Sequence, residues 1–219
     1  MIKIENLDVW GFEHAIRGMR NPMNSWDKSD SHTCGTGNEC DFCMFREEVC
    51  GNCYIGKNDL TLMHNLYKAG TEHRKYLRQI FVSMDITAPL YWWKEFDTYK
   101  VGTTANSCST MHKISAKKFE PIDFSTDHLT RSSMAVVDVT ISALNVARED
   151  YLKTKNKEFW WQMIQLLPSS YNQRRTIAMN YENVVSIIKQ RTGHKLDEWN
   201  EFVSVLEKLP YVKEIIDGR

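Results

Sequence analysis

The feature that most constrains this chain is an arginine on the apolar side of a predicted helix. The helix begins at Asn180, and at about 100° per residue its apolar stripe consists of Val184, Ile187 and Ile188. Arg191 falls near the middle of that stripe. Because a guanidinium keeps its charge, it needs an anion that it can bind with two parallel hydrogen bonds. We expect either an acidic side chain of this protein or an anionic ligand at Arg191, and Asn180 as the helix cap.

Size and charge indicate an ordinary globular protein. With 219 residues, of which 42% are hydrophobic, the chain can bury the core of a single domain over 1–219. The 28 basic side chains equal the 28 acidic ones, so no global charge favours a nucleic-acid or membrane partner. No window approaches the ~18 apolar residues of a membrane helix, and acidic residues interrupt the N-terminal segment where a signal peptide is apolar. We therefore expect a cytoplasmic location.

Hydrophobic periodicity predicts a helix-rich α+β fold with few strands. The expected strands cover 1–10 and 79–88, where apolar and polar residues alternate. The expected helices cover 11–20, 58–68, the residues after Pro89, 132–157, 180–191 and 195–208. In the helix over 132–157, one face that includes Ile141 and Leu144 is expected to be buried.

Residues 27–57 lack helical or strand periodicity and are predicted to be a cysteine-rich insertion. Two C-x2-C pairs lie six residues apart, and paired thiolates at this spacing bind tetrahedral zinc. A site with four sulfur ligands leaves no open position, so this zinc would be structural. An iron-sulfur cluster and unligated thiols are the alternatives. The four predicted ligands are Cys40, Cys43, Cys50 and Cys53, with His32 and Cys34 as further candidates.

Residues 102–110 are small and hydroxyl-rich. This composition is typical of a polar loop that lines a pocket around phosphate, ribose or a base, and it is equally typical of a solvated loop.

The spacing of several motifs resembles that of the flavin-dependent thymidylate synthases, the ThyX family. This chain has Ala88-Pro89 after a predicted strand, then Leu167-Pro168, with Asn180 twelve residues after the proline and Arg191 eleven residues further on. The resemblance runs from near the N-terminus to about Trp199. It implies a ThyX-like fold with a small antiparallel sheet, assembled as a homotetramer with active sites at subunit interfaces.

The resemblance also implies roles for individual residues. Ser25, His73 and Asn180 would contact FAD, and Arg191 would hold the nucleotide. The family's Arg-His-Arg motif, which grips flavin and substrate, falls on Thr98-Tyr99-Lys100 and thus lacks both arginines. The other substrate-side positions fall on Glu95, Asn106, Ser107, Cys108 and Ser109.

Three functions remain open at this point. The first is a divergent flavin enzyme that transfers a methyl or one-carbon group to a pyrimidine nucleotide such as dUMP, with methylenetetrahydrofolate as donor and NADPH as reductant. The second is a non-catalytic protein that binds or sequesters a nucleotide on the same scaffold. The third is an interaction module whose zinc loop contacts another macromolecule. Losing the motif arginines removes fixed charge and bidentate geometry, which weakens binding of a dianionic phosphate.

Overall fold

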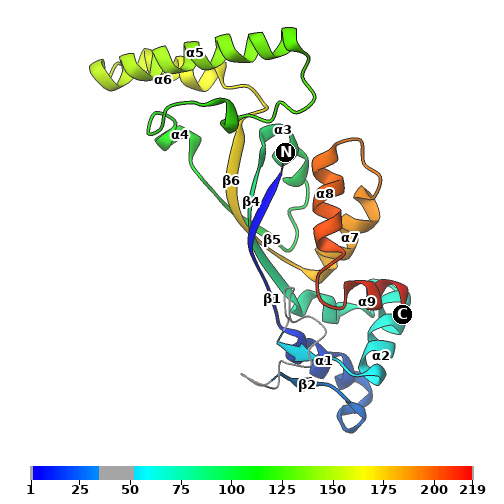
Figure 1. Cartoon of the computed structure of the whole chain (residues 1–219). Helices are drawn as coiled ribbons and strands as arrows, with labels where there is room; N and C mark the ends of the chain where they lie inside the picture. The colour runs from blue at the N-terminus through cyan, green and yellow to red at the C-terminus, as the bar shows by residue number, and fades with distance from the viewer. Residues whose placement is uncertain (1, 35–51, 219) are drawn as a thin grey trace. The chain divides into compact units, whose positions relative to one another are not determined.

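A computed structural model describes residues 2–34 and 52–218 (Figure 1). The strands and helices are β1 (Lys3–Trp10), α1 (Phe12–Arg20), β2 (His32–Thr33), β3 (Cys53–Tyr54), α2 (Lys57–Lys68), β4 (Phe81–Pro89), α3 (Leu90–Phe96), β5 (Thr103–Ser107), α4 (Thr110–Lys113), α5 (Arg131–Thr154), α6 (Lys157–Leu166), β6 (Asn172–Asn180), α7 (Tyr181–Arg191), α8 (Asp197–Leu206) and α9 (Val212–Asp217). The predicted α+β class with a small antiparallel sheet is confirmed.

Four strands form one sheet in the order β1-β4-β6-β5, and β2 pairs with β3 in a separate antiparallel sheet. The described residues divide into two compact units. The first consists of Met1–Lys3, Ile86–Thr98 and Asn106–Thr176, without the undescribed Met1. The second consists of Ile4–Asp85, Tyr99–Ala105 and Ile177–Arg219, of which 35–51 and Arg219 are not described. The single-domain organisation and the insertion bounds remain predictions.

Most predicted elements are confirmed, and proline explains two of the boundaries. Helix α1 ends at Arg20, directly before Asn21-Pro22, and α3 begins one residue after Pro89. Strands β1 and β4 and helices α2, α7 and α8 fall within about two residues of the predicted ranges. Among the described residues, no helix is both long and apolar enough to cross a membrane.

One predicted helix end and one predicted loop differ from the structure. The helix expected over 132–157 ends at Thr154, because Lys155 adopts a left-handed conformation (φ 58°) and Asn156 caps the next helix by accepting a hydrogen bond from the Glu158 N–H. The expected loop within 102–110 contains strand β5, which is bonded to β6. Strand β6 itself follows from no pattern noted in the sequence.

The first unit is built around the packing of α5 on α6, which lie alongside each other in Figure 1. Ile141, Leu144 and Ala147 form the buried face of α5, and Met163 meets them from α6. The predicted buried face of the long helix is therefore confirmed. Elsewhere in this unit, Trp93 is fully buried and its indole N–H donates to the Gln173 carbonyl at 2.9 Å.

The second unit packs aromatic side chains from distant segments. Phe12 contacts the rings of Tyr181 and Tyr211 edge to face, with centroids 5.5 Å apart in each case. The buried Tyr181 hydroxyl donates to the Pro210 carbonyl at 2.8 Å. These contacts join α1 to α7 and to the segment before α9.

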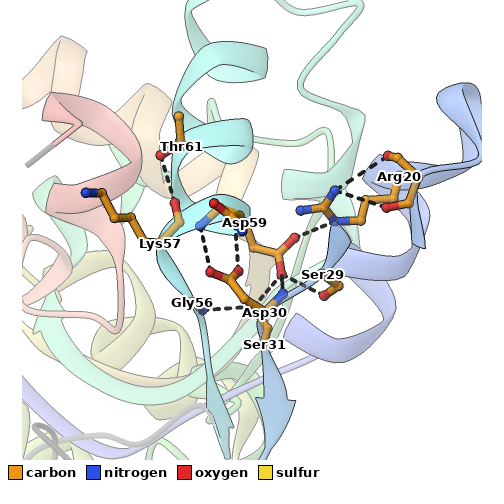
Figure 2. A network of polar contacts seen from close by, with 10 residues as sticks. Arg20, Ser29, Asp30, Ser31, Gly56, Lys57, Asp59 and Thr61 are labelled. Carbon is orange, nitrogen blue, oxygen red and sulfur yellow. Dashed lines mark hydrogen bonds and ion pairs between the residues drawn. The ribbon is translucent and has the colours of Figure 1, made fainter. Parts of the chain in front are cut away.

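A buried ion pair organises the N-terminal part of the second unit (Figure 2). Arg20 is 4% exposed and Asp59 is 0% exposed, and the Arg20 Nε donates to Asp59 Oδ1 at 2.6 Å. The second carboxylate oxygen accepts from the hydroxyls of Ser29 (2.7 Å) and Ser31 (2.6 Å). It also accepts from the Asp30 N–H at 3.2 Å. One carboxylate thus fixes the segment 29–31 between α1 and α2.

Removing the charge of Asp59 should destabilise the protein strongly. Asp59→Asn leaves the buried Arg20 guanidinium without its counter-charge, and breaking such a pair costs roughly 3–5 kcal/mol. Urea unfolding followed by circular dichroism measures the change. Asp27→Asn, at an exposed position in the same region, is the matched control and should change stability by less than about 0.5 kcal/mol. Equal stability of the two variants would contradict a structural role for the pair.

The same pair predicts a pH dependence. Burial raises the pKa of Asp59, but hydrogen bonds from Ser31, Ser29 and Arg20 and the charge of Arg20 outweigh it, so the pKa lies below its ordinary value of 3.8. The ionised form therefore stabilises the fold above that value, and this contribution is lost as the pH falls through the folded-state pKa. Wild-type protein should lose more stability than Asp59→Asn between about pH 6 and pH 3. An equal loss would rule out Asp59 as the titrating group.

Candidate functional site

The structure brings Ser25 and His73 to one cavity in the second unit. The cavity has a volume of about 760 Å³. It is lined by Gly18, Met19, Asn21, Pro22, Met23, Ser25, Leu62, Leu66, Glu72, His73, Lys75, Tyr76 and Gln79. The two predicted flavin-side residues are 48 positions apart in the chain. They are brought together by the tertiary fold, because no local sequence motif links them.

The Asp59 network also positions Ser25. The Arg20 Nη1 donates to the Ser25 carbonyl at 3.1 Å and lies 3.5 Å from its hydroxyl oxygen. Arg20 thus connects the buried carboxylate on α2 to one wall of the cavity. Arg20 therefore holds the segment 25–31 at Ser25, and Asp59 holds it at Ser29 and Ser31.

An ion pair connects the other wall of the cavity to α7. Arg74, which follows His73, donates from Nε to Glu182 Oε1 at 3.0 Å, and its Nη2 lies 2.8 Å from the same oxygen. Both side chains are about one-fifth exposed. The guanidinium of Arg74 is thus bound to a carboxylate of α7.

Asn180 caps α7, as the sequence predicts. Its side-chain oxygen accepts from the backbone N–H of Asn183 at 3.1 Å. The side-chain amide of Asn183 donates to the Val101 carbonyl at 2.7 Å. Gly102 follows with φ 78°, and a Cβ at this position would lie 2.7 Å from both Asn180 Nδ2 and Asn183 Oδ1. Only glycine fits both the conformation and the close approach.

Arg191 is half-buried at the C-terminal end of the same helix. Its Nε donates to the Tyr99 hydroxyl at 2.9 Å, and its Nη1 lies 3.1 Å from His194 Nε2. Its guanidinium lies over the Trp199 ring, 4.4 Å from the centroid. A cation stacked on an indole and bonded through Nε has a fixed orientation. Tyr99 contacts Arg191 at the C-terminal end of α7, and Val101 contacts Asn183 near its N-terminal end. The segment 99–102 therefore runs along α7.

His194 is a residue of this cluster that sequence reasoning missed. Its Nδ1 accepts from the Leu196 N–H at 3.2 Å, and its carbonyl accepts from the Asn200 amide at 2.9 Å. These bonds hold the ring beside Arg191. The only sequence signal is its position three residues after Arg191, where the helix has ended and no periodicity applies.

The first unit contains the other predicted substrate-side residues. Asn106, Ser107 and Cys108 are exposed, and the Cys108 backbone is bonded on both sides to β6: its N–H donates to the Arg174 carbonyl (2.9 Å) and its carbonyl accepts from the Gln173 amide (2.8 Å). Ser109 caps α4 by accepting from the His112 N–H at 3.1 Å.

The segment on which the resemblance places the Arg-His-Arg motif begins in the first unit, where the Thr98 hydroxyl donates to the Glu95 carbonyl at 2.7 Å. Lys100, which belongs to the second unit, is exposed. Sequence reasoning did not single out Arg175. Its Nη1 binds Asp97 Oδ1 at 2.7 Å, and its guanidinium lies 4.3 Å from the centroid of Trp93.

The metal prediction concerns mostly residues outside the described part. Cys40, Cys43 and Cys50 lie there, whereas Cys53 is buried in β3 with its Sγ 3.7 Å from the Tyr54 carbonyl oxygen. Within residues 2–34 and 52–218, no three His, Cys, Asp or Glu side chains form a group that could hold a metal. The zinc ligand set therefore stays a prediction.

Comparisons with known proteins give similarity in structure alone. No protein-family model matches the sequence, and no curated protein matches it. A crystal structure of the flavin-dependent thymidylate synthase ThyX from Helicobacter pylori, complexed with FAD and dUMP, matches with a TM-score of 0.67 at 14% identity, covering 98% of each chain. A second structure of ThyX from Helicobacter pylori with FAD and dUMP matches at 0.66 and 14%, covering 97% of this chain and 96% of that one.

This protein therefore has the fold of the flavin-dependent thymidylate synthases over nearly its whole length. The resemblance based on Leu167-Pro168, Asn180 and Arg191 is confirmed at the level of the fold. At 14% identity the likeness is one of architecture, and a fold can persist through changes that alter its activity.

Substituting Gly102 should disturb the packing of this segment against Asn180. Gly102→Ala adds the cost of a left-handed alanine, about 1–2 kcal/mol, and a clash with two amide groups. Gly193→Ala is the matched control, because Gly193 also has positive φ (71°) but nothing lies within 4 Å of its added Cβ. Thermal unfolding should show a lower Tm for Gly102→Ala than for Gly193→Ala. Identical melting temperatures would contradict the close approach.

Proposed function

We propose that this protein binds FAD and a pyrimidine nucleotide of the dUMP type, and that it transfers a methyl or one-carbon group to the base. The observation that carries the proposal is the convergence of Ser25 and His73 on one cavity of about 760 Å³. The two ThyX structures with this fold are complexed with FAD and dUMP. The same fold here supports, by analogy, the same classes of ligand.

The cavity fits a flavin by size and by lining. Its volume falls within the roughly 300–1,000 Å³ typical of ligand pockets. Apolar side chains such as Leu62 and Met19 can pack against a flat ring, and Ser25 and His73 can hydrogen bond to its polar edge or to a ribityl hydroxyl. Bound in its reduced form, the flavin would supply hydride.

Arg191 is proposed to bind the nucleotide phosphate. The Tyr99 hydroxyl and the Trp199 ring fix its guanidinium, so less orientational freedom is lost when it binds an anion. Lys100 is exposed in the same unit and can add positive charge. By the same resemblance, Thr98 is proposed to contact the flavin and the substrate, and Glu95 and residues 106–109 are proposed to contact the substrate.

The full reaction requires further components. Methylenetetrahydrofolate as one-carbon donor, NADPH as reductant and a homotetramer with active sites at subunit interfaces are proposed on the same resemblance. The residues of this chain would bind and orient the ligands and exclude water, and no cysteine nucleophile is required.

A non-catalytic nucleotide-binding role is the second candidate. Thr98 and Lys100 occupy the two arginine positions of the motif, and the Thr98 hydroxyl is bonded to the Glu95 carbonyl. A hydroxyl and an ammonium bind phosphate less strongly and with less directional control than two guanidinium forks. Such a site is better suited to holding a ligand than to stabilising a transition state.

Titration with FAD tests cofactor binding. Quenching of flavin fluorescence should saturate at one FAD per protomer for the wild type. The double substitution Ser25→Ala and His73→Ala should weaken affinity about tenfold or more, because each lost hydrogen bond contributes on the order of 0.5–1.5 kcal/mol. His112→Ala, on exposed α4, is the control and should bind normally. Wild-type protein that binds no FAD would refute the flavin proposal. Binding without turnover, with all substrates supplied, would favour the non-catalytic role.

Arg191→Lys tests the phosphate role. The substitution keeps the charge but loses the bidentate fork and the Nε bond to Tyr99, so affinity for dUMP should fall about fivefold to tenfold. Isothermal titration calorimetry measures the change, with Lys189→Arg, exposed on the same helix, as the control. Unchanged dUMP affinity in Arg191→Lys would remove this role.

A further inference from the structure

A second cavity lies in the second unit, and the proposed function does not use it. It has a volume of about 310 Å³. One wall is a face of α1, and the other consists of residues from the segment 26–33 together with Cys53 of β3. Among the described residues, none lines both this cavity and the one at Ser25 and His73. We call it the α1 cavity.

Helix α1 separates the two cavities. At 100° per residue, the four α1 side chains that line the α1 cavity fall within a sector about 100° wide: Glu13, Ile16, Arg17 and Arg20. Gly18 and Met19 lie on the other side of the helix and line the candidate flavin cavity. Most of the second wall of the α1 cavity lies in the predicted insertion 27–57, so this cavity does not depend on the ThyX motifs.

Arg20 brings an unused hydrogen-bond donor to the α1 cavity. Its side chain is almost fully buried, and its Nε and Nη1 bind Asp59 and Ser25. Its Nη2 makes no hydrogen bond within the part of the chain that the structure describes, and Figure 2 shows dashed lines from only the other two guanidinium nitrogens. A guanidinium nitrogen that water barely reaches needs an acceptor, and a carboxylate fits its geometry well.

The charges at the cavity favour a ligand with a single negative charge. Arg17 lies one turn before Arg20 on the same face, and Glu13 is the acid that lines the cavity with them. The Arg17 Nη1 is 4.0 Å from Glu13 Oε1, so this ion pair is loose. Asp59 binds Arg20 without lining the cavity, and it weakens the attraction for an anion. One negative charge can therefore lie between the two guanidinium groups, whereas a second would meet Glu13.

Trp26 adds an apolar surface to the cavity. Its side chain is 51% exposed, and its indole N–H donates to Asn21 Oδ1 at 2.8 Å, which fixes the orientation of the ring. Ile16 adds a second apolar contact. Little conformational freedom is lost when a flat ring stacks on an indole that is already held in place.

We propose that the α1 cavity binds a free aromatic monocarboxylate. The carboxylate binds the guanidinium groups of Arg20 and Arg17, and the ring packs against Trp26 and Ile16. A volume of about 310 Å³ lies at the lower end of the range for ligand pockets and suits one ring or two fused rings. This site is independent of the flavin proposal, because the two cavities have separate linings.

Isothermal titration calorimetry of the full chain with benzoate tests the site. Trp26→Leu removes the stacking surface and Arg17→Gln removes one positive charge, and each should weaken benzoate binding about fivefold or more. Trp161→Leu and Arg131→Gln are the matched controls, because both side chains are exposed and belong to the first unit, and both variants should bind benzoate like the wild type. Circular dichroism melts confirm that the four variants are folded.

Two further titrations test the ligand class and the location. Benzamide has nearly the same shape without the charge and should bind at least about tenfold more weakly than benzoate. His73→Ala changes the other cavity and should leave benzoate binding unchanged.

Three results would overturn the proposal. They are a wild type that shows no saturable benzoate binding up to about 10 mM, equal affinity for benzamide, and benzoate binding that Trp26→Leu and Arg17→Gln leave unchanged. None of these results bears on FAD binding, which is measured separately.

Discussion

The buried Arg20–Asp59 pair is the interaction on which the N-terminal half of the second unit depends. A guanidinium and a carboxylate removed from water are tolerated only when the hydrogen bonds around them are complete. Here the requirement is met by Ser29, Ser31 and the Asp30 N–H on one side and by the Ser25 carbonyl on the other. The need to satisfy two buried charges therefore determines where the Ser25 segment lies, and with it one wall of the candidate flavin cavity.

A second constraint acts along α7. The segment 99–102 follows this helix, held by Tyr99 at Arg191 and by Val101 and Gly102 at the N-terminal turn. Tyr99, Val101 and Gly102 thus belong to the same compact unit as Asn180 and Arg191. The positions of Asn180 and Arg191 therefore depend on the geometry of α7 and on its contacts with this segment.

The sequence predicted those parts of the fold whose signal is local. Proline at positions 22 and 89 marks helix boundaries, and the apolar face with Ile141 and Leu144 is regular enough to identify α5. Strand β6 was missed because only the second half of its inward-facing side is apolar. Ile177 and Met179 are apolar, but Gln173 and Arg175 are polar, so the apolar–polar alternation of a strand is too short to recognise. Strand β5 was interpreted as a loop because its mostly exposed residues include no apolar alternation, and pairing with β6 alone defines it.

For the site, the sequence identified the cap at Asn180 and the unusual position of Arg191, but it could not identify the partners of Arg191. Tyr99 reaches it from 92 residues away, and His194 and Trp199 lie beyond the end of the helix, where periodicity gives no information. The meeting of Ser25 and His73 depends likewise on tertiary structure.

The cavity at Ser25 and His73 is the proposed flavin site. Hydrogen exchange with mass spectrometry, in the presence and absence of FAD, tests it most directly. If FAD binds there, amide exchange should slow in 18–25 and 72–79, the two segments that supply most of the cavity wall. Saturating FAD that leaves both segments unchanged, or that protects only residues elsewhere in the chain, would contradict it.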